Sequence, residues 1–467
     1  MGVVTKTKFS DFAIHPLIRG DYKFINYKRN IEVNYTNSLK VKNAINSYYK
    51  GFAFKSVDFS DNDEIFVIKG DMFENDFSIN YVDADFLSDS FFEDKKYKNF
   101  IVKKGDVITS LVGSIGKMVI VSEETKSLLN QNNIALRVNT TIYEIKIFAY
   151  LLKMKVKELA DNVYKNYGYS FLAINDLFDI NLPFIKLDKQ KEILFEIIEI
   201  ENEITILKNS KLKPLDIINK VFGEEFGFDW EEFENIRKEK TYYSSLLNYS
   251  NNIDCRFGFR FQHKSGKYLM DFLKEKTSKR IKDFIKIPIS LGASVSPSQY
   301  DEDGDYYYIS MATVKKYYFD KNDAQKVSVA YSNENLNKSI EINDIIMTRS
   351  GMAIGKFALI NEEIDGIYAD FTMRIRLENF NPLLAYYYFR SVFFQHLIAT
   401  HKKGLQNHNI FPSQIQEFPI PDWNEDKQTE IVEKIKSQID AQNIIDKQIE
   451  QKQQQINGII ENAIKTE

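Results

Sequence analysis

The sequence predicts a mixed α/β protein built from two pseudo-symmetric modules, separated by two long helices that pair as an antiparallel coiled coil. Three observations predict this fold class. A block of sequence recurs after about 240 residues. Each copy contains short β-type runs between Gly, Asn and Asp turns. Each copy then ends at a proline that precedes a helix with regularly spaced isoleucines, which indicates a duplicated module with a connector.

The composition sets the size and class of the protein. A chain of 467 residues is too long for one ordinary core, so two or three domains are expected. The 36 Phe and 27 Tyr, against 2 Trp, favour β-rich modules with many half-buried aromatic positions. The net charge of −4 excludes a uniformly basic nucleic-acid-binding protein, so any such surface must be local.

Cysteine usage and hydropathy bound the compartment. The one cysteine, Cys255, excludes an internal disulfide framework. The first residues lack the apolar stretch of a signal peptide, and no window approaches the roughly 18 consecutive apolar residues of a membrane-spanning helix. We therefore expect a cytoplasmic protein.

The recurrence is clearest around a glycine-rich turn. The segment 104–117 reappears at 343–356, where one residue is inserted between the Asp and the Gly-Lys pair, and the run 134–138 reappears as 373–377. The order of the matching segments is kept along the chain. Two homologous modules are therefore expected.

Further matches extend the recurrence in both directions. Downstream, a Leu-Pro pair followed by Gln190 matches a Phe-Pro pair followed by Gln428. Upstream, the segment 66–77 can be laid over 308–319 without a gap. Each module therefore spans the strands, the following helix and the proline boundary.

Each proline boundary is followed by an amphipathic helix. Packing of each helix on its own module is one alternative, but two similar seams in equivalent places favour an antiparallel pair. About 30 residues at 1.5 Å each would hold the modules roughly 45 Å apart. The expected seam residues are Ile193, Ile197, Ile200, Ile204 and Leu207 in the first helix, and Ile431, Ile435, Ile439, Ile445, Ile449 and Ile456 in the second.

The boundaries follow from these elements. We place the modules at residues 1–185 and 250–422, and the helices at 186–222 and 423–467. Residues 223–249 are expected to be a linker or the first element of the second module.

Motifs for catalysis and metal binding are incomplete. Residues 351–357 have three residues between the glycines, whereas a phosphate-binding loop has four, and they lack the Ser/Thr after Lys. Residues 381–384 lack the second Pro and the aromatic of an adenine methyltransferase motif, and the acids at 422–427 suit a helix N-terminus. Three histidines have irregular spacing and no carboxylate or Cys among them: His396, His401 and His408. We expect no catalytic residue, no metal and no cofactor in this chain.

Candidate contacts to nucleic acid are cations and hydroxyls in matching places of the two modules. No acidic residue occurs from Arg390 to Gln416, and 165–168 holds the equivalent place in the first module. The glycine-rich turns would let backbone approach a duplex while polar side chains face outward. Solvated loops and purely structural hairpins are the alternative at each place. The candidates are Lys55, Lys96, Lys98, Ser114, Lys117, Lys165 and Tyr167, with Lys315, Lys316, Arg349, Ser350, Lys356, Lys402 and Lys403.

Three motifs resemble those of a known family. Residues 51–56 and 292–298 are similar to two openings of its recognition domains, and 344–351 with 354–356 is similar to its most recognisable motif. The first module carries a degraded copy of that motif, in which Leu111 replaces the arginine. Over nearly its whole length the chain resembles the specificity subunits of type I restriction-modification systems.

The resemblance implies a DNA-recognition subunit without catalysis of its own. Each module would be a target-recognition domain that reads one half of a bipartite duplex site, and the helices would set the spacing. Two methyltransferase subunits would dock on the helices and bind S-adenosylmethionine, and nuclease-translocase subunits would join them in the restricting complex. The target sequence itself cannot be read from the chain.

Other functions remain open on the residues alone. The chain could serve a restriction system whose partner fuses nuclease and methyltransferase. A stand-alone DNA nuclease and a scaffold that never binds DNA are alternatives from other classes.

Overall fold

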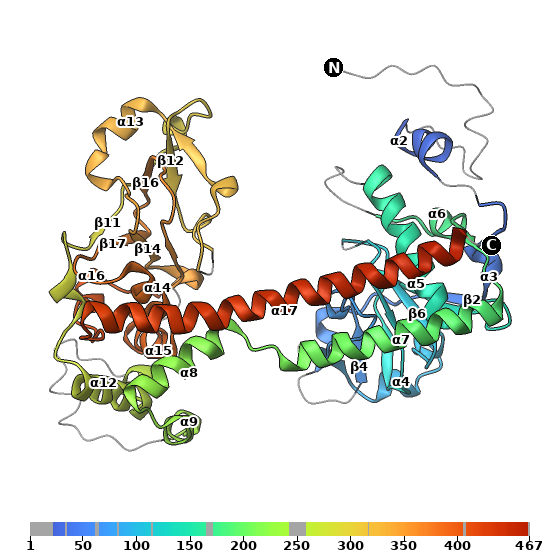
Figure 1. The fold of residues 1–467 in the computed structure, drawn as a ribbon, viewed down its shortest axis with the longest axis horizontal. Helices are drawn as coiled ribbons and strands as arrows, with labels where there is room; N and C mark the ends of the chain where they lie inside the picture. Colours follow the sequence, from blue (N-terminus) through green and yellow to red (C-terminus); the bar gives the residue numbers. More distant parts are fainter. Residues whose placement is uncertain are drawn as a thin grey trace. The chain divides into compact units, whose positions relative to one another are not determined.

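The computed structural model describes residues 22–32, 35–60, 65–81, 84–113, 115–164, 171–241, 258–315, 317–404 and 408–465. The chain forms two compact units. Unit 1 comprises residues 1–209 and 447–467, and unit 2 comprises residues 210–446. Both contain helices and sheets, which confirms the predicted mixed fold (Figure 1).

Unit 1 contains two four-stranded sheets, and we call the one with the longer strands the larger sheet. The larger sheet is antiparallel, and its strands in spatial order are β2 (Ile45–Lys50), β9 (Asn133–Val138), β6 (Asp106–Ser110) and β7 (Met118–Ile120). The smaller sheet has β4 parallel to β8, and its order is β3 (Phe59–Ser60), β5 (Asp85–Leu87), β4 (Ile65–Ile68) and β8 (Ser127–Leu129). A short pair, β1 (Ser38–Lys40) with β10 (Asn181–Pro183), lies at the module boundary.

Alternating side chains of the larger sheet of unit 1 fill two cores. Val107 and Leu136 lie in a core that also contains side chains from three helices, namely α5 (Ile145–Leu159), α7 (Leu187–Ser210) and the last part of α17 (Glu425–Lys465). Ile108 and Ala135 join a second core with Ile68 of the smaller sheet. The period of two along a strand thus produces three layers, with the larger sheet in the middle.

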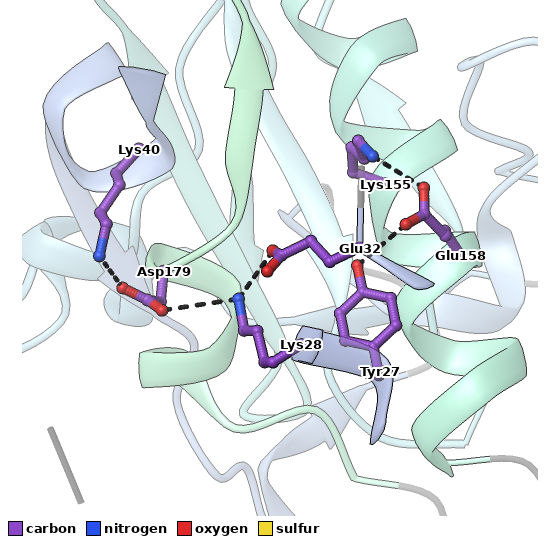
Figure 2. A network of polar contacts seen from close by, with 7 residues as sticks. All are labelled: Tyr27, Lys28, Glu32, Lys40, Lys155, Glu158 and Asp179. Carbon is purple, nitrogen blue, oxygen red and sulfur yellow. Dashed lines mark hydrogen bonds and ion pairs between the residues drawn. The ribbon is translucent and has the colours of Figure 1, made fainter. Parts of the chain in front are cut away.

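The segment before β1 is held on unit 1 by a polar network (Figure 2). The Tyr27 hydroxyl donates to Glu158 at 3.3 Å, and the buried Lys155 ammonium pairs with the other oxygen of Glu158 at 2.8 Å. Lys28 lies 3.6 Å from Asp179, just after α6 (Ile174–Phe178). The contacts join the π-helical turn Tyr27–Ile31, which follows α2 (Tyr22–Asn26), to the helical layer of the unit.

Unit 2 repeats the layers with a smaller outer sheet. Its larger sheet is antiparallel, in the order β11 (Ser290–Leu291), β17 (Thr372–Ile375), β14 (Ile345–Thr348) and β15 (Phe357–Leu359). Its outer sheet has three strands, β13 (Gln325–Val327), β12 (Tyr306–Ile309) and β16 (Gly366–Tyr368), with β12 parallel to β16. Its main core also includes α14 (Pro382–Arg390), α15 (Val392–His401) and α12 (Lys264–Lys276).

The predicted helix at 186–222 is interrupted. It consists of α7 and of α8 (Pro214–Phe226), with Pro214 in the first turn of α8 and Lys213 in an extended conformation. Proline has no backbone N–H to donate, and its ring would clash with the preceding turn of a continuous helix. A new helix therefore begins at Pro214. Residues from 223 onward, expected to be a linker or the first element of the second module, continue α8 and then form α9 (Trp230–Lys238), whose Phe233 is buried in the core of unit 2. The second alternative is therefore correct for the described residues 223–238.

The predicted antiparallel pairing is confirmed for α7 and the last part of α17. Glu203 pairs with Lys452, and the flanking surface is lined by Leu207 and Gln448. Ile449 and Ile456 lie in or against the core that holds four of the predicted α7 seam residues, namely Ile193, Ile197, Ile200 and Ile204. Figure 1 shows the two helices running side by side in this unit.

The rest of the predicted seam packs differently. Ile431 and Ile435 are fully buried in the core of unit 2, beside residues of α8, and Ile439 packs against that core. Ile445 is half-buried between the two sets. The alternative of packing on the helix's own module is therefore correct for the first turns of α17.

The duplication is visible in equivalent contacts of the two units. Asp106 accepts a hydrogen bond from Arg137 at 3.1 Å, and Asp344 accepts two from Arg376, both at 2.6 Å. Gln190 and Gln428 each accept a backbone N–H that precedes a helix, from Glu144 and Asn381 respectively, at 2.8 and 2.7 Å. These matches confirm the downstream alignment of the two modules.

The upstream alignment was wrong by one residue. The Ile68 carbonyl accepts from Asn130, and in the same way the Ile309 carbonyl accepts from Ala369. Ile68 therefore corresponds to Ile309, whereas the ungapped alignment placed Ile68 over Ser310. A slip of one residue moves every side chain to the other face of the strand. The buried hydrophobic side chains on both faces of β4 and β12 hid that slip from the sequence pattern.

Candidate nucleic-acid interface

The glycine-rich turn of each module is the hairpin loop between a central strand of its larger sheet and the neighbouring edge strand, β6 and β7 in unit 1 and β14 and β15 in unit 2. Gly116 and Gly355 have φ of 83° and 81° in these loops. A Cβ on Gly116 would lie 3.0 Å from Val156, and one on Gly355 would lie 3.0 Å from Ile398. These glycines therefore serve turn geometry and close contact with the adjacent helix.

In unit 2 the start of the hairpin loop is hydrogen-bonded on one side to the residue before β17 and on the other to the segment after α15. The Arg349 N–H donates to the Phe371 carbonyl at 3.0 Å, and the Arg349 carbonyl accepts from Ile410 at 2.9 Å. Asp370 in turn donates its N–H to Ala293 of the 292–298 opening, at 3.2 Å. We call this meeting of the segments 292–294, 349–351, 369–371 and 408–410 junction 2.

Unit 1 contains the same arrangement, which we call junction 1, formed by 51–52, 111–112, 130–133 and 171–172. The Leu111 N–H donates to Asn132, and the Leu111 carbonyl accepts from Leu172, both at 2.8 Å. Gln131 donates to Phe52 of the 51–56 opening at 2.9 Å. Three motifs that lie far apart in the sequence are thus adjacent in space in both units.

The openings contribute a glycine where no side chain fits. A Cβ on Gly51 would lie 2.0 Å from the carbonyl oxygen of Asn130, and one on Gly292 would lie 2.0 Å from that of Tyr368. Backbone atoms cannot move aside as a flexible side chain can. The two glycines therefore fix the approach of each opening to its junction.

The charge at the two junctions differs. In unit 2 the half-buried Arg349 donates through Nε to the Asp370 carbonyl at 3.1 Å, and its Nη1 lies 3.5 Å from Asn409 Oδ1. In unit 1 the equivalent Leu111 is fully buried. A guanidinium held by neutral oxygens keeps its full positive charge, so junction 2 presents a cation suited to phosphate or to a base edge.

The other predicted residues of the 348–357 and 402–411 loops differ in how far they are exposed. Lys356 is exposed, whereas Ser350 is buried, with its hydroxyl against the sulfur of Met311. The expectation that Ser350 faces outward is therefore wrong. Lys402 is half-buried, and burial together with Arg260 lowers its pKa. The Lys403 ammonium lies 5.8 Å from the ring centre of Phe411, and the residue is half-buried.

The other predicted cations differ in exposure and in their local partners. Lys315 forms an ion pair with Asp323, a bond that raises its pKa. Lys96 is exposed and lies 5.2 Å from the ring centre of Phe52, at the edge of junction 1. Lys55 and Lys98 are exposed, and Lys117 is half-buried in the hairpin loop of unit 1. Lys96 thus lies beside junction 1.

Four predicted residues fall outside the described part of the chain: Ser114, Lys165, Tyr167 and Lys316. Among the residues that are described, no group of His, Cys, Asp and Glu is arranged to hold a metal ion. Within the same residues, no helix combines the length and apolar character needed to cross a membrane.

An aromatic cluster at junction 1 was missed in the sequence. Phe52 lies 5.2 Å from Phe54, 5.1 Å from Tyr97 and 5.3 Å from Phe100, measured between ring centres. Two Phe separated by one residue at 52 and 54 were a signal, but the partners lie more than 40 residues away in the sequence, and spacing alone cannot identify them.

The sequence matches one family model twice. The model is the type I restriction modification DNA specificity domain, and it matches residues 39–214 and 274–455. No curated protein matches the chain.

Solved structures resemble the chain at low identity. One concerns the complex assembly and conformational transition of a type I R-M system, with 11% identity, 93% of this chain and 99% of that chain covered, and a TM-score of 0.47. The S subunit of a type I restriction-modification system from M. genitalium has 11% identity, coverage of 94% and 96%, and a TM-score of 0.32. The HsdS subunit from Thermoanaerobacter tengcongensis has 12% identity, coverage of 92% and 93%, and a TM-score of 0.30.

Proposed function

Because the chain belongs to the type I restriction modification DNA specificity domain family and contains two copies of that domain, we propose that its two units read the two halves of a bipartite duplex target. The protein is a DNA specificity subunit and a non-catalytic member of its restriction-modification system. The two recognition domains would extend over residues 1–185 and 250–422.

The observation that carries this proposal is the duplicated junction. Each unit brings an opening, a hairpin loop and a post-helix segment to one place. Base edges are read by a few side chains from loops that a rigid scaffold positions. Arg349 of junction 2 and Lys96 beside junction 1 supply charge next to that surface. We propose that the predicted cations outside the junctions contact the phosphate backbone.

The helices supply the second part of the proposal. The paired α7 and α17 would set the distance between half-sites, and they would dock two methyltransferase subunits. α7 has exposed apolar side chains that suit a protein partner, namely Phe195, Ile198 and Ile206. The methyltransferase would bind S-adenosylmethionine and flip its target adenine, and nuclease-translocase subunits would join in the cytoplasm for cleavage.

A selection experiment tests this function. The full chain is combined with its methyltransferase subunit and used to select from a pool of randomised duplex DNA. We expect two short sequences at a fixed separation. Selection of a single continuous site, or of none, would contradict the proposal.

A further inference from the structure

Two positions flank the hairpin loop in each junction, one on either side. In unit 1 they are Asn132, which accepts from the Leu111 N–H, and Phe171, which bridges to Val112. The equivalent contacts in unit 2 are made by Phe371 and Asn409. Both junctions therefore contain one Phe and one Asn, with the two residue types in exchanged places.

The two phenylalanines are conspicuously exposed. Phe171 is 47% exposed and Phe371 is 49% exposed, whereas most of the other Phe side chains that the structure describes are buried or half-buried. Single exposed apolar residues are common on protein surfaces. Two at opposite flanks of equivalent loops, on segments unrelated in sequence, indicate a shared role.

We propose that the Phe–Asn pair of each junction is its base-reading pair. This inference rests on the proposed function and deepens it. A carboxamide can donate to and accept from an adenine edge in the major groove, and an aromatic side chain can pack on a thymine methyl group. An A·T base pair presents both features, so this pair of side chains suits a target with an A·T base pair in each half-site.

The exchange of places gives the two units different readouts on one frame. In unit 1 the Asn lies on the strand side of the loop and the Phe on the post-helix side, and unit 2 has the reverse order. Arg349 lies between the two in unit 2, with Asn409 Oδ1 at 3.5 Å from its guanidinium. Two domains with the same scaffold would thereby select different half-sequences.

The test uses the full chain in complex with its methyltransferase subunit, after the wild-type target has been selected from randomised duplexes. Phe371→Ala should reduce discrimination at one or two positions of one half-site by about 10-fold and leave the other half-site unchanged. Phe171→Ala and Asn132→Ala should act only on the other half-site. Leu383→Ala, which removes a 40% exposed side chain from α14, is the matched control and should change neither.

The salt dependence of binding separates base reading from phosphate contact. Neither Phe nor Asn displaces counterions, so the slope of log affinity against log salt should stay unchanged in these variants. Melting temperatures within a degree or two of wild type would confirm that the exposed side chains do not hold the fold. Unchanged discrimination at both half-sites, or equal losses at both, would overturn the inference. Failure of the wild-type complex to select a bipartite site would instead refute the proposed function.

Discussion

Units 1 and 2 share an inner frame and differ at the outside. The frame consists of the Asp–Arg pair across the larger sheet and the glutamine at the start of the long helix. The outer sheet has four strands in unit 1 and three in unit 2. A buried ionic pair tolerates little change because the loss of one partner strands the other, whereas outer loops can vary freely. The comparison separates what holds a recognition domain together from what it reads.

The hairpin loop lies on the boundary between frame and surface. Its glycines and backbone contacts are the same in both units, yet Leu111 is buried where Arg349 meets the surface. The same backbone position thus carries a buried apolar side chain in unit 1 and a half-buried cation in unit 2. Four experiments can break or sharpen this comparison.

The largest expected effect comes from the frame itself. Asp344→Ala should lower the free energy of unfolding of unit 2 by about 3–5 kcal/mol, because Arg376 would lose its buried partner. Asp106→Ala should act in the same direction on unit 1 but less strongly, because the Arg137 side chain is 36% exposed and stays partly hydrated. Hydrogen exchange followed by mass spectrometry reports on each unit separately. Glu341→Ala, which removes only the exposed partner of Arg376, should cost less than about 1 kcal/mol. Equal loss of protection in both units from Asp344→Ala would show that the frames are not independent.

Acid should weaken unit 2 through a buried histidine. Burial lowers the pKa of His396 to about 4, with smaller contributions from Arg237, His263 and His401. His396 binds a proton more tightly in the unfolded chain than in the folded one. Its contribution to the free energy of unfolding is therefore intact above pH 6.5 and is lost as the pH falls from 6.5 to 4, by about 3 kcal/mol in total.

The difference between wild type and His396→Gln isolates this contribution from the carboxylates that titrate at lower pH. Urea unfolding of both proteins at pH 7 and pH 4.5 measures it, and the variant should show the smaller loss of stability. His408→Gln is the matched control on the loop after α15. An identical pH dependence of wild type and His396→Gln would disprove the assignment.

The shared helix should set the half-site spacing. Removal of residues 440–446, about two turns of α17, should weaken binding to the original spacing by roughly 100-fold or move the preferred spacing, because both half-sites could no longer be engaged together. The two half-sequences should stay the same. Selection from a pool with variable spacers measures this, and a changed base preference at unchanged spacing would count against it.

The smallest effect tests the charge difference between the junctions. Arg349→Leu gives junction 2 the residue type of junction 1 and should weaken DNA binding by about 10-fold, with a salt slope smaller by roughly 0.9 if the contact is to phosphate. Fluorescence anisotropy at several salt concentrations provides both values. Arg237→Leu on α9 is the control. No change in affinity would mean that the guanidinium only supports the loop.

The sequence predicted the elements that repeat and missed those that depend on distant partners. The glycine-rich turn, the Gln helix starts and the long helices were visible because they depend on local chemistry or on regular spacing. The break at Pro214 was overlooked because the apolar periodicity continues on both sides of it. The burial of Ser350 depends on Met311, which is far away in the sequence. The junctions themselves needed the fold, since four separate segments form each of them.

The division of α17 between the units has a consequence for how the protein is made. The core of unit 1 includes Ile456, Ile460 and Ala463, which follow all of unit 2 in the sequence. The first unit to emerge therefore waits, with one side of its core uncovered, until the whole of unit 2 has been translated. Loss of the last turns of α17 would damage unit 1 and leave unit 2 with all its residues.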